Sequence, residues 1–171
     1  MSRRSGTFLA FAVFSACALG VVGWAQGAPK AKGKEPEAMK EHAVAPAAAD
    51  MDKAATLEGL LTKKGPRDWS SNKGATIEGF VMQVEKDQDG DIVLFLALAP
   101  DQTDTKRWLL AEVSPDWQKK APELSEESCR NLYGKKVKVT GWLYYDDKGD
   151  QDPRGTLWEI HPVTSLASIA R

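Results

Sequence analysis

Histidine and cysteine are scarce in this sequence, which holds two of each. Cys17 lies in an apolar stretch near the N-terminus and His42 in a segment rich in Ala and Lys, which leaves Cys129 and His161 for the rest of the chain. A lone cysteine cannot form an internal disulfide, and one histidine without a suitable cysteine does not complete a zinc site. No serine stands in a visible histidine–acid context. These absences argue against a disulfide scaffold, a zinc centre and a serine hydrolase, and we expect Cys129 to be packed in the core.

The sequence also lacks an excess of positive charge. The chain has 23 basic and 24 acidic residues, and residues 75–171 hold 12 basic against 17 acidic residues. A protein that binds phosphate backbones normally shows a basic footprint. The composition therefore disfavours nucleic acid as the partner.

Only one long hydrophobic run occurs, at residues 8–22, and it is shorter than the about 20 residues that a membrane-spanning helix needs. Two arginines precede it, and Gly23-Trp24-Ala25 follow it with small residues where a signal peptidase cuts. We expect residues 1–25 to be a signal peptide that is cut near Ala25. The mature protein would then be periplasmic or extracellular, without a transmembrane span. A lipoprotein attached at Cys17 and an uncleaved anchor are the alternatives.

Residues 26–54 are rich in Ala, Lys, Glu and Pro and hold few large apolar side chains. Such a segment cannot bury enough surface to offset the entropy of ordering, so we expect a disordered tether. Residues 55–74 are an uncertain N-terminal extension of the next domain. Their sequence ATLEGLL resembles ATIEGFV at 75–81. The likeness is either a coincidence or a local duplication, or both copies are strands and the first lies on the barrel edge.

Residues 75–171 show apolar runs of strand length that are separated by turn sequences such as DQDGD at 87–91, where Gly90 can take a positive φ. Ser114-Pro115 marks the start of a helical turn. We expect strands at 76–86, 92–99, 106–113, 135–145 and 156–160, a helix at 123–133 and a last short strand at 163–169.

Three strands, a helix and two strands are the order of the OB-fold, an all-β, five-stranded Greek-key barrel. Gly141, inside the fourth expected strand, fits the sharp bend of a small barrel. The helix would plug one barrel end with Leu124, Cys129 and Leu132. An SH3-like barrel, which does not want a helix at that place, and an open β-sandwich are the rival folds.

Two sequence motifs carry a resemblance to a known family. GKKVKVTGWL at 134–143 is similar to the strand after the helix in bacterial OB-fold proteins. RGTLWEIHPV at 154–163 resembles the closing motif of a family of exported bacterial OB-fold proteins that has no established activity. The resemblance implies an OB-fold and a binding role toward nucleic acid, oligosaccharide or protein, which is an analogy at the level of the fold.

Seven aspartates lie in the two loops that flank the usual binding face of an OB-fold. The first loop is not an EF-hand, because Ile92 and Leu98 stand where glycine and glutamate are required. The carboxylates are either two solvated loops, which would repel phosphates, or the ligands of a hard cation such as calcium. We expect no other cofactor. The weak metal candidates are Asp87, Asp89, Asp91, Asp146, Asp147, Asp150 and Asp152.

Glu159 and His161 are two residues apart on one expected strand and therefore share a face. A carboxylate beside an imidazole can orient it for acid–base or metal chemistry. A hydrogen-bonded histidine near the barrel seam is the simpler interpretation.

Trp142 and Tyr144 share a face of their strand with Lys138. Aromatic residues interleaved with lysine can stack on bases or sugars, or can pack on the barrel exterior beneath residues 57–74. With Arg154 from the closing motif, the tentative ligand-binding residues are Trp142, Tyr144, Lys138, Arg154, Glu159 and His161.

The sequence thus predicts an exported, non-catalytic and monomeric OB-fold binding module. Its ligand would be a protein partner or an envelope saccharide, bound at the face of strands two and three and at the two acidic loops. A single-stranded nucleic-acid binder is one alternative. A cation-dependent envelope hydrolase that uses Glu159, His161 and a loop-bound cation is another.

Overall fold

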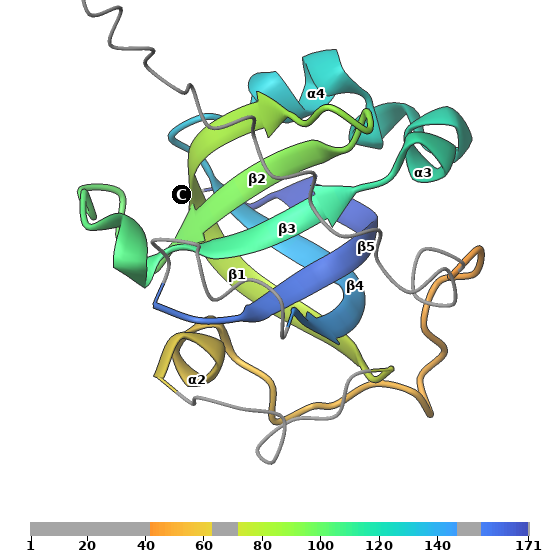
Figure 1. Cartoon of the computed structure of the whole chain (residues 1–171), viewed down its shortest axis with the longest axis horizontal. Coiled ribbons are helices and arrows are strands. Elements are labelled where there is room, and N and C mark those ends of the chain that lie inside the picture. The colour runs from red at the N-terminus through yellow and green to blue at the C-terminus, as the bar shows by residue number, and fades with distance from the viewer. Residues whose placement is uncertain (1–41, 63–71, 147–154, 171) are drawn as a thin grey trace, which may run out of the picture. The chain divides into compact units, whose positions relative to one another are not determined.

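Five strands close into a barrel in the order β1-β2-β3-β5-β4 (Figure 1). The computed structural model describes residues 42–62, 72–146 and 155–170. All neighbouring strands are antiparallel except β3 and β5, which close the barrel in parallel. This order is that of the OB-fold, so the predicted fold is confirmed. The strands are β1 (Gly74–Lys86), β2 (Ile92–Ala97), β3 (Leu109–Val113), β4 (Lys136–Tyr145) and β5 (Trp158–Ser168).

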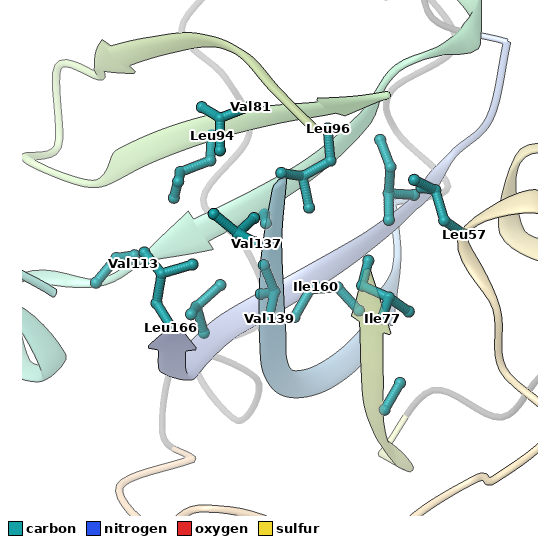
Figure 2. Packing of buried hydrophobic residues seen from close by; sticks show 14 of the residues in the cluster. Leu57, Ile77, Val81, Leu94, Leu96, Val113, Val137, Val139, Ile160 and Leu166 are labelled. Atoms are coloured by element: carbon teal, nitrogen blue, oxygen red, sulfur yellow. The ribbon is translucent and has the colours of Figure 1, made fainter. Parts of the chain in front are cut away.

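The barrel interior is filled by every second residue of each strand, as strand geometry requires. On β4 the inward set is Val137, Val139, Gly141 and Leu143, as the alternation of the sequence predicts, and all four are buried. Figure 2 shows aliphatic side chains of all five strands that point toward one another inside the barrel, among them Ile77, Leu94, Val113, Val139 and Ile160. The core is thus a closed apolar layer, and the residues between these positions point to the outside of the barrel.

Gly141 lies where β4 bends across β5, and the pairing register shifts on both sides of it. A Cβ atom at this position would lie 2.5 Å from Ile160 Cγ2 and 2.5 Å from the carbonyl oxygen of Pro162. The predicted bend is confirmed, because only glycine allows the two strands to approach this closely.

The segment between β3 and β4 folds into three short helices. They are α3 (Pro115–Lys120), η2 (Pro122–Leu124) and α4 (Glu126–Arg130). The single helix expected at 123–133 is therefore divided. Ser125 is extended and caps α4 by accepting a hydrogen bond from Ser128 N, which separates the helix from η2.

The predicted plug of the barrel end is confirmed for two of its three residues. Leu124 and Cys129 are fully buried, whereas Leu132 is half-buried against the core. Burial raises the pKa of the Cys129 thiol to about 11, so this cysteine is an uncharged core residue at neutral pH.

All five strand predictions differ from the structure by some residues at one or both ends, and two of the differences have a clear cause. Residues 105–107 form a 3-10 turn before β3, because Asp104 caps it through Lys106 N. The tail expected as a separate strand at 163–169 is instead a continuation of β5. Pro162 lies inside β5 at the place where its pairing with β4 is irregular, and there the missing N–H of proline costs no ladder hydrogen bond.

Residues 57–62 form helix α2 (Leu57–Thr62), which corrects the interpretation of this segment as an edge strand. Thr56 caps the helix by accepting a hydrogen bond from Gly59 N, and Leu57 and Leu60 are buried. In the similar sequence at 75–81, Thr76 lies in β1, where it is paired with Thr140 of β4 and contacts its side chain. The two copies differ because only the second has strands to pair with. Figure 1 shows α2 and α4 at opposite ends of the barrel.

Residues 42–54, expected to belong to a disordered tether, run along the barrel with defined contacts. Gly74 N donates to Asp50 O at 3.0 Å, and Asp52 N donates to Gly74 O at 2.7 Å. The signal peptide and the first part of the tether lie outside the described residues. Among the described helices, none is long and apolar enough to cross a membrane.

We predict that Gly141→Ala lowers the free energy of unfolding by about 2 kcal/mol or more, because the added methyl overpacks the β4–β5 contact. Urea unfolding followed by tryptophan fluorescence measures the change. Ser165→Ala, at an exposed position of β5, is the matched control and should change stability by less than about 0.5 kcal/mol. Equal stabilities of Gly141→Ala and the wild type would contradict the close approach.

Candidate functional site

A buried polar cluster lies on the outside of the barrel where β2, β3 and β5 meet. Ile92, Ala111 and Ile160 point inward, so their neighbours Asp91, Glu112 and His161 point outward. Ala111 is paired with Ile160 across the parallel seam, which places Glu112 and His161 side by side. The barrel packing itself therefore brings the three side chains together.

The geometry of this cluster is compact and shielded from solvent. His161 Nδ1 lies 2.8 Å from Glu112 Oε2, and His161 Nε2 lies 3.8 Å from Asp91 Oδ2. One donor atom from each residue falls within 4.8 Å of the other two. The three residues are 4% (Asp91), 8% (Glu112) and 3% (His161) exposed, so their charges interact through little water.

The contact with Glu112 determines which ring nitrogen of His161 carries the proton. A carboxylate 2.8 Å from Nδ1 favours the proton on that nitrogen, which leaves the lone pair of a neutral imidazole on Nε2. Nε2 faces Asp91, and the ring of Tyr144 lies edge-on with centroids 6.3 Å apart. The arrangement is a carboxylate–imidazole pair with a second carboxylate opposite the basic nitrogen, which suits proton transfer or metal ligation.

Sequence reasoning found His161 and missed its partner. Glu159 lies on the same outer face and is buried, opposite Leu110 on β3 and Tyr144 on β4. The carboxylates next to the His161 ring come from Glu112 and Asp91 instead. Glu112 carried a signal, because it is the only charged residue in the apolar strand LLAEV. His161, the neighbour of Glu112 on β5, is far away in the sequence, so the local pattern does not pair the two residues.

The first aspartate-rich loop is a hairpin turn. Asp87 N donates to Asp91 O, Gly90 N donates to Asp87 O, and Gly90 has a φ of 93°. Asp89 is exposed and Asp87 is half-buried, while Asp91 is buried in the cluster. A fully solvated loop is therefore wrong for Asp91. In the second loop Asp146 is half-buried, and Asp147, Asp150, Asp152 and Arg154 lie outside the described residues.

The remaining tentative ligand-binding residues are on β4. Lys138 is exposed and lies 3.6 Å from Glu78, so it forms a surface ion pair. Trp142 and Tyr144 are buried on the outer face. The packing expected for Trp142 is present, but the described contacts come from residues 42–44.

Residues 42–46, named the strap here, lie on this side of the barrel. Three consecutive strap carbonyls accept hydrogen bonds from barrel side chains. Trp117 Nε1 donates to His42 O at 2.9 Å, Lys120 Nζ to Ala43 O at 2.8 Å, and Trp142 Nε1 to Val44 O at 3.0 Å. The strap therefore links α3 to β4, the strand beside His161.

The strap histidine is the one side chain of this segment that stacks on the barrel. Its ring lies parallel to that of Trp142, with centroids 3.9 Å apart, while Ala43 and Val44 are exposed. Burial and the nearby His161 lower the pKa of His42, and a hydrogen bond with Asn72 opposes that shift.

Comparison with known proteins finds similar folds only. No family model and no curated protein matches the chain. Among solved structures, the S. pombe Stn1-ten1 complex has a chain that is 13% identical with a TM-score of 0.38, covering 57% of this chain and 59% of that one.

Two synthetases were also found. The aspartyl tRNA synthetase from Entamoeba histolytica is 20% identical with a TM-score of 0.42, covering 71% of this chain and 22% of that one. A putative aspartyl-tRNA synthetase from Leishmania major Friedlin is 11% identical with a TM-score of 0.45, covering 75% and 23%. The chain thus spans less than a quarter of these synthetases, and its assignment to the OB-fold follows from its own strand order.

We predict that Glu112→Ala lowers the free energy of unfolding by about 3 kcal/mol, because it leaves the buried His161 imidazole without its carboxylate. Glu112→Gln keeps an oxygen toward Nδ1 and should lose less than half of that amount. Urea unfolding in the presence of a chelator measures both. Glu85→Gln, at an exposed position of β1, is the control. Equal losses for the alanine and glutamine variants would show that the contact with His161 Nδ1 contributes nothing to the free energy of unfolding.

Proposed function

We propose that the chain is an exported, non-catalytic OB-fold module that binds an extended polypeptide where the strap lies. The observation that carries the proposal is the run of three consecutive peptide carbonyls held by side-chain donors of α3 and β4. Export rests on the signal-peptide pattern of residues 1–25.

The contacts of the strap support a peptide as the ligand of this surface. An indole N–H is a donor only, so Trp117 and Trp142 require an acceptor that is aimed at the barrel. Consecutive peptide carbonyls provide acceptors at a regular spacing along an extended chain. Ala43 and Val44 are exposed, so these contacts depend on the backbone and tolerate different side chains.

The contact between His42 and Trp142 supports selectivity for a partner that has a flat ring at this position. The His42 ring covers the face of Trp142, and a flat ring in this place gains stacking and burial. A partner with an aromatic residue or a histidine at the position of His42 would match the strap. Such a partner would compete with the strap for the same donors.

A protein partner fits this surface better than a nucleic acid. The outer face beside the strap holds the carboxyl groups of Asp91, Glu112 and Glu159, which raise the cost of bringing phosphates close. Lys120, the one cation among the three donors, is already bound to Ala43 O. A saccharide would supply hydroxyl acceptors but not the regular spacing of peptide carbonyls.

The test uses the mature chain, residues 26–171, and a labelled peptide with the sequence MKEHAVAPAA of residues 39–48. In the wild type the strap occupies the surface. His42→Ala removes the stacking that holds the strap, so this variant should bind the peptide at least about 5-fold more tightly than the wild type, which corresponds to about 1 kcal/mol. Fluorescence anisotropy measures the affinity.

The controls separate this proposal from its alternatives. Val44→Ala changes an exposed side chain and should behave as the wild type. Adding Trp142→Ala to His42→Ala should abolish binding of the peptide. Failure of the His42→Ala chain to bind the peptide at any concentration up to 1 mM (about 4 kcal/mol of binding free energy) would contradict the proposal. So would salt-dependent binding of a single-stranded oligonucleotide that Trp142→Ala abolishes.

A further inference from the structure

We propose that Asp91 and His161 bind a divalent transition-metal ion on the outside of the barrel, with Glu112 orienting the imidazole. The site goes beyond the polypeptide-binding function and does not depend on it. It consists of the buried cluster of Asp91, from the turn before β2, with Glu112 and His161 from the β3–β5 seam.

The distance between the two ligand atoms supports an ion between them. His161 Nε2 and Asp91 Oδ2 are 3.8 Å apart, which is too far for a hydrogen bond. Zinc-bound nitrogen and oxygen atoms each lie about 2.0–2.2 Å from the ion, so two ligands of one ion are at most about 4.3 Å apart. The observed separation falls inside that span, and the ion needs no movement of the strands.

The contact on the other ring nitrogen is the one that metal-binding histidines need. Such histidines hold the proton on one nitrogen against a carboxylate, a carbonyl or a water, which fixes the ring and makes the other nitrogen a better ligand. Glu112 Oε2 lies 2.8 Å from Nδ1 and fills that role. Both carboxylates and the ring are buried, so their orientations are set by packing.

The donor set selects the class of metal. Calcium takes six to eight oxygen ligands, and magnesium keeps most of its water. An imidazole nitrogen with carboxylate oxygen is instead suited to zinc, cobalt, nickel or manganese. The proposed site departs from the expectation that no second histidine or suitable cysteine completes a zinc site. That expectation counted histidines and cysteines and had no means of placing Asp91 and Glu112 beside His161.

The test is a titration of the chelator-treated mature chain with ZnCl₂ by isothermal calorimetry. We expect one ion per chain with a Kd of 10 μM or lower, of order 7 kcal/mol, and no heat with CaCl₂. Asp91→Asn and Glu112→Gln should each weaken zinc binding by about 10- to 100-fold. Asp101→Asn, at an exposed aspartate outside this turn, is the matched control and should bind as the wild type.

A second measurement keeps the proposal testable if a variant does not fold. The chain has two histidines, so ¹⁵N-histidine NMR of the wild type and of His42→Ala assigns all four ring nitrogens. Zinc should shift His161 Nε2 and leave Nδ1 protonated. No zinc binding by the folded wild type, or an Asp91→Asn variant with wild-type affinity, would overturn the site. Either result would identify the cluster as a structural set of buried ion pairs and leave the peptide test of the strap unaffected.

Discussion

The parallel pairing of β3 with β5 is the constraint on which the rest of the structure depends. This short seam closes the barrel, and its register is fixed because Ala111 and Ile160 must both fill the interior. The same register places Glu112 beside His161 on the outside. A slip of β5 by one residue would turn His161 into the apolar core and Ile160 to the outside. The packing of the barrel and the geometry of the polar cluster are therefore one arrangement.

Much of the fold could be predicted from local sequence patterns. The alternation in β4, the bend at Gly141 and the burial of Cys129 follow from period-2 spacing and from residue chemistry, and the structure confirms them. The helix at 57–62 could not be predicted in this way. Its sequence nearly repeats the start of β1, and the choice between helix and strand depends on the partners that each copy meets.

The candidate site was predicted only in part, because its residues come from β3, β5 and the turn before β2. His161 stood out as the one histidine of the domain, but its neighbours are set by the barrel register. Local composition also placed residues 42–54 in a tether. The strap is held by donors on α3 and β4, 75 to 98 residues away along the chain. Contacts of this kind offset the entropy of ordering residues 42–54, which the segment alone could not offset.

The proposed binding surface depends on the strap occupying the space between α3 and β4. Hydrogen exchange of the indole Nε1–H groups, followed by NMR on the mature chain, tests this most directly. We predict that the indoles of Trp117 and Trp142 exchange at least about 100-fold more slowly than free tryptophan, which corresponds to about 2.7 kcal/mol of protection. Exchange of both indoles at the rate of free tryptophan would contradict the account.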